Sequence, residues 1–298
     1  MKFRFRVCLL APLLGLPLAA SAAEPPHPIR ILLTNDDGYA APGIQAEFAA
    51  LKAAGFEVTM VAPRDNQSGM SMRITMSPLT YKEEAPGVWA VDGSPADSAA
   101  VGLKVVMRDR KPDLVVSGAN LGQNAGRTAN ISGTVGAATM AAQLGVPAVA
   151  VSVGIDMQEA KASPKPFPST LQAFPAAADF TVAVVKQLVA QAGQGALLPP
   201  SALLNVNYPV VPGGKPKGVK LAHHSAVDAY SFDYKPTDKP NEVKLALGAR
   251  ERQANDAPLA DTTLFDAGYV TITVLDGDWG APANVRDGVA QKLAPLAK

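Results

Sequence analysis

The chain has 298 residues, with 27 Lys plus Arg against 26 Asp plus Glu, and 48% of its residues are hydrophobic. A near-neutral chain of this kind lacks the clustered positive charge that nucleic-acid polymers require, which excludes DNA and RNA as partners. The length suits one large domain, or a domain with an appended arm, and allows a substantial buried core.

The first residues are typical of an export signal. Lys2, Arg4 and Arg6 precede an apolar run over residues 7–20, and a small-residue cleavage site completes a predicted signal peptide over residues 1–22. The apolar run is shorter than the about 20 residues of a membrane span, so we expect a periplasmic or secreted protein without a membrane anchor after cleavage. The single cysteine lies within this segment, which excludes thiolate catalysis in the mature chain.

The region from residue 29 to residue 153 alternates apolar strands with helical stretches. This alternation predicts an α/β fold with a Rossmann-like, mostly parallel sheet and flanking helices. Ser94 is a predicted N-cap, since Pro95 and Asp97 follow it in the first turn. The expected elements are a strand at 29–34, a helix at 43–54, a strand at 56–62, two extended segments within 73–91, a helix from 95 to 107, a strand at 113–117, a helix at 134–144 and a strand at 148–153.

The C-terminal half changes character after a helix expected around 174–191 and a strand at 203–207. Prolines and glycines interrupt short extended runs there, which predicts an irregular β arm around 209–265. A strand at 269–275 is expected to rejoin the main sheet, and a short helix is expected near 289–296. One domain over residues 29–298, with the arm protruding from it, is therefore predicted.

Two adjacent carboxylates, Asp36 and Asp37, follow the first strand. Neighbouring side chains in a strand point to opposite faces, so the pair can converge on one ion only where the backbone leaves the sheet, and Gly38 supplies that exit. Ligands of open sheets bind beyond the carboxyl ends of the strands, where this pair is expected to lie. The pattern favours a metal site, and a solvated turn with a helix cap is the alternative.

Polar loops follow two further strands. The loop after 56–62 contains Ser68, and the glycine-rich stretch after 113–117 contains Asn120 and Asn124. Hydroxyl and amide oxygens can ligate a hard cation at the same edge of the sheet, and oxygen donors select Mg²⁺, Mn²⁺ or Ca²⁺ over softer metals. A turn with self-bonding Asn side chains is the alternative for the second loop.

Ser132, Gly133 and Thr134 open the Ala-rich helix. Free N–H groups at a helix start attract anions, and the two hydroxyls add donors, which predicts an uncharged phosphate site. Ordinary N-capping is the alternative. The three histidines of the chain lie outside these segments, so a carboxylate is the expected proton donor or acceptor, with Asp36 and Asp37 as the catalytic candidates.

These runs resemble the SurE family of survival-protein nucleotidases, in the strand ending TNDDG, the AP-containing loop and the SGxN and SGTVGAA motifs. The resemblance implies a SurE-like nucleotidase that hydrolyses nucleoside 5′- or 3′-monophosphates. It implies one Mg²⁺ or Mn²⁺ per subunit and an arm-mediated homodimer or homotetramer. By the same resemblance, Asp36, Asp37, Ser68 and Asn120 are the metal ligands, and Asn124, Ser132, Gly133 and Thr134 bind phosphate.

Other readings stay open at this point. One is a broad-specificity exported acid phosphatase, and another is a non-catalytic periplasmic protein that binds phosphate esters. An aspartyl-phosphate mechanism of the haloacid-dehalogenase type would need Asp-x-Asp, whereas Asn35 precedes two adjacent acids here.

Overall fold

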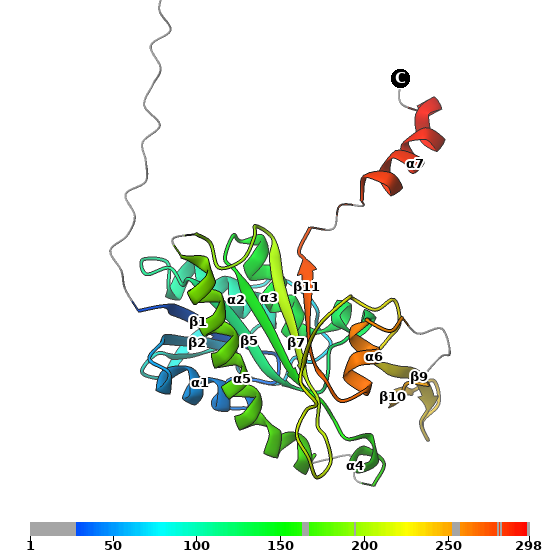
Figure 1. The fold of residues 1–298 in the computed structure, drawn as a ribbon, viewed down its shortest axis with the longest axis horizontal. Coiled ribbons are helices and arrows are strands. Elements are labelled where there is room, and N and C mark those ends of the chain that lie inside the picture. Colours follow the sequence, from blue (N-terminus) through cyan, green and yellow to red (C-terminus); the bar gives the residue numbers. More distant parts are fainter. Residues whose placement is uncertain are drawn as a thin grey trace, which may run out of the picture.

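The computed structural model describes residues 28–162, 167–193, 195–251, 257–278, 280 and 282–296, so the predicted signal peptide lies outside the described residues. A nine-stranded sheet of order β3-β4-β2-β1-β5-β6-β7-β11-β8 forms the centre of the molecule, with helices on both faces (Figure 1). Strands β4, β2, β1, β5, β6 and β7 are parallel to their neighbours in this run. The predicted Rossmann-like α/β fold is confirmed.

The strands of the main sheet are β1 (Arg30–Thr34), β2 (Glu57–Pro63), β3 (Tyr81–Ala85), β4 (Val88–Val91), β5 (Leu114–Leu121), β6 (Ala148–Val153), β7 (Ala202–Tyr208), β8 (Val219–Ala222) and β11 (Val270–Asp276). A separate hairpin consists of β9 (Tyr230–Pro236) and β10 (Val243–Ala249). The helices are α1 (Pro42–Ala53), α2 (Pro95–Val101), α3 (Gly133–Gln143), α4 (Met157–Ala162), α5 (Pro168–Ala192), α6 (Asp261–Asp266) and α7 (Ala283–Leu293). Three shorter helical turns are η1 (Gly102–Val106), η2 (Arg127–Ile131) and η3 (Ala294–Leu296).

The core follows from the two-residue period of the strands. In β1, Ile31 and Leu33 pack into the apolar cluster beneath α1 and α5, whereas Leu32 packs into the cluster beneath α2 and α3. All five β1 residues are buried, as expected for a central strand covered on both faces. The sheet is therefore a rigid support for the loops at its carboxyl edge.

Helix starts follow the predicted signals. Ser94 caps α2 in a capping box with Asp97, and Ser132 caps α3 by accepting the N–H of Val135 at 3.1 Å. The expected helix from 95 to 107 changes after Val101 into the wider π-helical turn η1.

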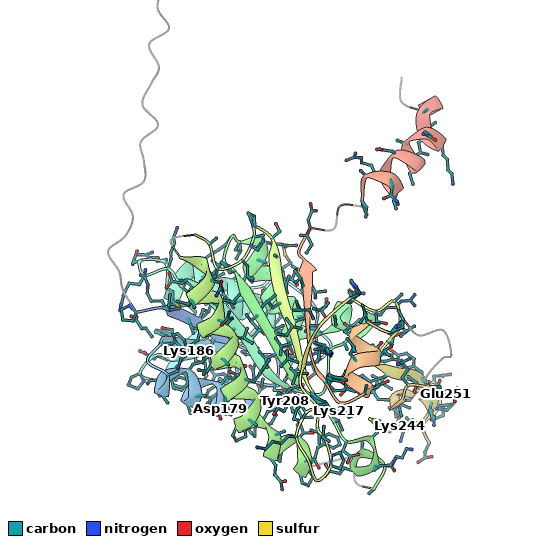
Figure 2. The ribbon with its side chains drawn as sticks, in the orientation of Figure 1. Asp179, Lys186, Tyr208, Lys217, Lys244 and Glu251 are labelled. Atoms are coloured by element: carbon teal, nitrogen blue, oxygen red, sulfur yellow. The ribbon has the colours of Figure 1, made fainter. Side chains whose placement is uncertain are left out.

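Three boundaries differ from the prediction, and one of them is the start of α7, which was expected near residue 289 and lies at Ala283. Strand β5 continues to Leu121, because its pairing with β6 shifts register between Ser117 and Asn120 and then resumes. Helix α5 begins at Pro168, since a proline at the first helical position needs no N–H partner there. Among the described residues α5 alone is long and apolar enough to cross a membrane, but its inner side packs on the sheet, and its outer side carries Asp179 and Lys186 (Figure 2).

The region of the predicted arm, 209–265, contains three kinds of structure. Strand β8 joins the main sheet beside β11, β9 and β10 form the protruding hairpin, and the short helix α6 was not predicted. The two ends of the arm meet through backbone hydrogen bonds. The His223 N–H donates to Leu259 O, and the carbonyl oxygen of His223 accepts the N–H of Asp261, both at 2.8 Å. Strand β11 returns to the main sheet as expected, and α7 stands apart from the sheet (Figure 1).

Candidate active site

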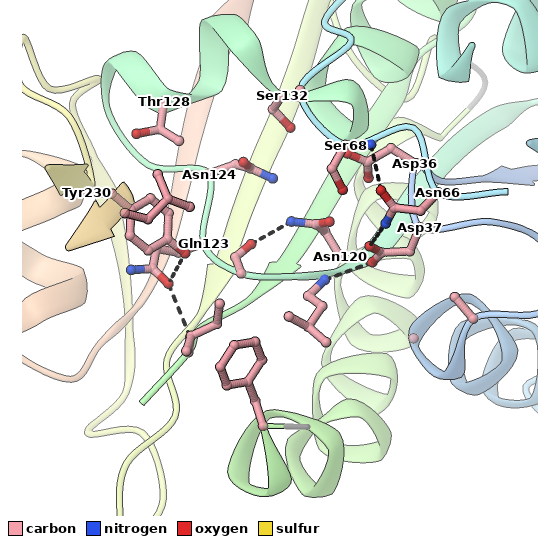
Figure 3. Close-up of a pocket in the computed structure, with 18 of the residues that line it drawn as sticks. Asp36, Asp37, Asn66, Ser68, Asn120, Gln123, Asn124, Thr128, Ser132 and Tyr230 are labelled. Atoms are coloured by element: carbon pink, nitrogen blue, oxygen red, sulfur yellow. Dashed lines mark hydrogen bonds between the residues drawn. The ribbon is translucent and has the colours of Figure 1, made fainter. Parts of the chain in front are cut away.

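The site lies at a topological switch point of the sheet. The chain passes from β1 to β2 on one side and later returns to β5 on the other side, so the loops after β1 and β5 diverge and leave a crevice. A cavity of about 860 Å³ lies there. The four predicted metal ligands line it together: Asp36 and Asp37 after β1, Ser68 after β2, and Asn120 in β5 (Figure 3).

The turn after β1 is formed by Asn35 and not by the two carboxylates that follow it. The Asn35 side chain closes an Asx turn, donating from Nδ2 to Gly38 O at 2.9 Å and accepting the Gly38 N–H at 3.2 Å. Gly38 has φ +105°, and a Cβ there would lie 3.3 Å from Arg64 O, so glycine permits the close approach of the loop after β2. Because Asn35 makes the turn, neither neighbouring carboxylate is needed for it.

Asp37 is held by the end of β5 and by the loop after β2. Its Oδ2 accepts the N–H of Leu121 at 2.9 Å, and its Oδ1 accepts from Asn66 Nδ2 at 3.1 Å. Asn66 in turn accepts the N–H of Ser68 at 3.1 Å. The loop after β2 and the end of β5 are therefore coupled through one carboxylate (Figure 3).

Asp36 is buried against the start of α3. Thr134 Oγ1 donates to Asp36 Oδ1 at 2.5 Å, and the Thr134 N–H also stabilises this carboxylate. Burial, and next the negative charge of Asp37, raise the pKa of Asp36 to about 7 despite these hydrogen bonds. Because Asp36 is desolvated and lies beside Asp37, a cation bound between them would stabilise the ionised form of both carboxylates.

The amide of Asn120 is oriented by the backbone. Its Nδ2 donates to Gly122 O at 2.7 Å, which leaves Oδ1 on the side of the two carboxylates (Figure 3). The Ser68 hydroxyl lies on the same side of the cavity (Figure 3). Carboxylate, amide and hydroxyl oxygens form a donor set that fits a hard divalent cation such as Mg²⁺ or Mn²⁺.

The four predicted phosphate ligands are placed unequally. Asn124 and Ser132 line the cavity, whereas Gly133 and Thr134 lie behind Asp36. The Asn124 Nδ2 donates to Ser152 Oγ at 2.9 Å, and its N–H donates to Asn207 Oδ1 at 2.7 Å. In this structure the first turn of α3 thus stabilises Asp36, and the phosphate roles of these residues stay predictions.

The lining has two chemical characters. Of the described residues that line the cavity, two are acids and none is Lys, Arg or His. Away from the acids the wall is mostly apolar, with Gln123 and Thr128 as polar members. Its apolar side chains come from α5 and the residue before it, the loop after β6 and the hairpin: Ile155, Phe167, Leu171, Phe174, Tyr230, Phe232, Leu245 and Leu247. The cavity has the size of a small-molecule site, with convergent polar groups at one end.

Three residues at the site were not predicted as site residues. Asn66 belongs to the loop already expected at the site, and its proximity to Ser68 could have indicated it. Gln123 was read only as part of a polar loop. Tyr230 is 107 residues from its hydrogen-bond partner Gln123 and carries no local signal.

Known proteins are similar to this chain in sequence and in fold. The family model described as survival protein SurE matches residues 31–230. A 5′-nucleotidase SurE from Roseobacter denitrificans is 35% identical over 277 residues, covering 90% of this chain and 98% of that protein. One from Anaeromyxobacter sp. (strain K) is 44% identical over 256 residues, covering 84% and 91%.

A solved structure is also similar. The crystal structure of the SurE protein from Aquifex aeolicus has a TM-score of 0.71 and 30% identity, covering 88% of this chain and 98% of that one. The match to the family model and the near-complete coverage of these relatives agree with the motifs that follow β1, β2 and β5. The chain therefore belongs to the SurE family.

Proposed function

We propose that this protein is a nucleotidase, a phosphoric monoester hydrolase that converts nucleoside 5′- or 3′-monophosphates to nucleoside and phosphate. The observation that carries the proposal is the cavity at the switch point. It combines two carboxylates and further oxygen donors at one end with an apolar wall at the other. The curated relatives named 5′-nucleotidase SurE support the same activity.

We propose that the site uses one divalent cation, Mg²⁺ or Mn²⁺, held by Asp36, Asp37, Ser68 and Asn120. A phosphate dianion would be repelled by two carboxylates, and the described lining offers no cationic side chain to offset them. When bound, a divalent cation supplies charge neutralisation for the phosphoryl group and lowers the pKa of a coordinated water.

The chain's own residues supply position and proton transfer. Asp37 is fixed by Leu121 and Asn66, and Asp36 by Thr134, so both carboxylates are held before substrate enters. These two acids are the proposed general acid or base, because no histidine lines the described cavity. Ser132 and Asn124, at the cavity wall, are the proposed phosphate contacts.

The test is hydrolysis by chelated and metal-reconstituted protein. We expect no phosphate release after chelation and recovery with Mg²⁺ or Mn²⁺, using 5′-AMP, 3′-AMP, other nucleotides and simple phosphomonoesters. Equal rates over the whole panel would favour a broad-specificity acid phosphatase. Calorimetric binding of AMP without phosphate release would favour a binding protein and overturn the proposed activity.

We propose further that the protein is exported to the periplasm or secreted, on the basis of the basic and apolar N-terminal sequence. Fractionation of expressing cells and N-terminal sequencing test this. We expect the mature chain to begin at Ala23 and to be recovered outside the cytoplasm. An intact Met1 in the cytoplasmic fraction would contradict it.

We propose that the chain forms a homodimer or homotetramer. The hairpin supports this, since its exposed apolar side chains include Tyr234, Val243 and Leu245. Light scattering on purified protein tests the proposal. We expect a mass of two or four chains, and a single-chain mass at all concentrations would contradict it.

A further inference from the structure

Gln123, in the loop after β5, lines the cavity without any role in the proposed chemistry. Its side chain is largely buried, with the residue 6% exposed. Its Oε1 accepts the N–H of Ile155 at 3.2 Å and the hydroxyl of Tyr230 at 2.7 Å (Figure 3). One atom of the amide is therefore used twice by the protein.

These contacts fix which way the amide faces. A backbone N–H can only donate, so the atom that faces Ile155 N must be the oxygen of Gln123. The amide nitrogen then remains for the ligand, since Nε2 donates to no acceptor within the described part of the chain. Gln123 is thus a cavity-lining residue whose amide nitrogen has a fixed orientation and no protein acceptor in the described part of the chain.

The contact with Tyr230 joins the protruding hairpin to this loop. Gly122 makes room for it, because φ is +115° there and a Cβ would lie 3.0 Å from the Tyr230 hydroxyl oxygen. The turn η2 is also hydrogen-bonded to the residues just before the hairpin. The Arg127 N–H donates to Val227 O, and the Ala229 N–H donates to Thr128 Oγ1, both at 3.0 Å. Burial raises the pKa of the Tyr230 hydroxyl, so it remains a donor at neutral pH.

The surroundings of Gln123 suit a flat, mostly apolar group. Tyr230, Phe232, Leu245 and Leu247 of the hairpin and Phe167, Leu171 and Phe174 at α5 line the same cavity. Aromatic and aliphatic side chains of this kind pack on planar rings, and a single donor among them selects orientation. A nucleobase has both a planar face and acceptor atoms at its edge.

We propose that Gln123 is a specificity residue, whose amide nitrogen donates to an acceptor on the nucleobase, and that Tyr230 is a positioning residue that holds the amide in this orientation. The inference rests on the proposed nucleotidase function and adds which residues read the base. The end of the cavity that contains Asp36 and Asp37 would then carry out the reaction. The end that contains Gln123 and Tyr230 would set the preference for nucleotides over other phosphomonoesters.

The central test is Gln123→Glu, which keeps an acceptor for Ile155 and Tyr230 but removes the donor. AMP is compared with ribose 5-phosphate, which has the same sugar phosphate and no base. We expect the ratio of kcat/KM for AMP to that for ribose 5-phosphate to fall about tenfold, mainly through KM for AMP. Gln158→Glu, the same change at an exposed position on α4, is the matched control and should leave the ratio as in the parent.

Two further variants separate charge and structure from base reading. Gln123→Met lacks the donor without adding charge, and it should lower the same ratio while also lowering the unfolding temperature, because Ile155 and Tyr230 lose their acceptor. Tyr230→Phe should lower the ratio about threefold, since one of the two hydrogen bonds that orient the amide is lost.

The outcomes are distinct. A parent protein that releases phosphate from no nucleotide overturns the proposed function itself. An active parent whose ratio is unchanged in Gln123→Glu and Gln123→Met overturns the specificity inference alone. Equal losses on AMP and ribose 5-phosphate also overturn it, because they would assign the effect to the end that contains Asp36 and Asp37.

Discussion

The two ends of the cavity are built differently. The acidic end is anchored on the central strands β1 and β5, and its carboxylates accept hydrogen bonds from Leu121, Asn66 and Thr134. The other end depends on the hairpin, which reaches the sheet loops through Tyr230 and whose tip is exposed. The proposed catalytic groups are thus held by the sheet, whereas the proposed recognition of the base depends on a contact between the hairpin and the loop after β5.

The largest expected effect is at the acidic end. Asp37→Asn should reduce kcat for AMP by at least about 100-fold at saturating Mn²⁺, because a proposed ligand and proton-transfer group loses its charge. Phosphate release measures this. Asp65→Asn, an exposed acid in the loop after β2, is the control. A parent-like rate in Asp37→Asn would refute the assignment.

A buried glutamate between α1 and α5 predicts a pH dependence of stability. Glu47 is fully buried between α1 and α5, where it accepts from Thr181 at 2.8 Å, and burial raises its pKa to about 8. The native state then binds more protons than the unfolded state between the unfolded pKa of 4.5 and about 8. This contribution to stability is fully present below the lower value and is lost as pH rises through the upper one.

Glu47→Gln removes that titration. As pH rises through this window, we expect the free energy of unfolding of the variant to increase by a few kcal/mol relative to that of the parent. Urea unfolding of both proteins at acid, neutral and alkaline pH measures the difference. Asp238→Asn, at an exposed position in the turn between β9 and β10, is the control, because its charge is remote from Glu47. A flat difference for Glu47→Gln would mean that its pKa is ordinary.

A smaller effect is expected from crowding Asp36. A Cβ on Gly133 would lie 2.7 Å from Asp36 Cβ and 2.8 Å from Pro95 Cγ, so Gly133→Ala must displace both side chains or the start of α3. We expect a loss of about 1–3 kcal/mol in stability and reduced phosphate release. Gly288→Ala in α7 meets nothing within 4 Å and should not destabilise the protein. Equal thermal unfolding temperatures for the two variants would argue against close packing of Gly133.

The smallest effect is expected at the hairpin tip. Tyr234 is 68% exposed, so Tyr234→Ser should change the folding free energy by no more than about 0.5 kcal/mol in a single chain. Denaturant unfolding at low protein concentration measures this. A larger loss that grows with protein concentration would instead place Tyr234 in contact with a second copy.

The acidic end could be predicted from sequence because its information is local. Asp36 and Asp37 follow an apolar strand directly, and Asn120 lies close to the end of the strand predicted at 113–117. The prediction that Asn120 lies in a loop was wrong, since β5 pairs with β6 again at Asn120 after a shift in register that follows Ser117. Alternating apolar runs also sufficed to predict the parallel sheet.

The other end could not be predicted, because it is made by contacts between distant segments. Gln123 and Tyr230 meet only after the hairpin folds back on the loop after β5. Helix α6 was missed for a related reason: it has no side-chain cap, and its buried Asp261 is satisfied by the N–H groups of Gly126 and Ser225 from elsewhere in the chain.

The closure of the arm at His223 has a consequence for how the family can diversify. The chain leaves and re-enters the body at neighbouring points, where His223 is bonded to both Leu259 and Asp261. Residues between these points can be lengthened, shortened or exchanged without altering the spacing of β8 and β11. If Tyr230 holds Gln123 as proposed, exchanging this segment between relatives should change the preference for the base while the strands that carry Asp36, Asp37 and Asn120 stay the same.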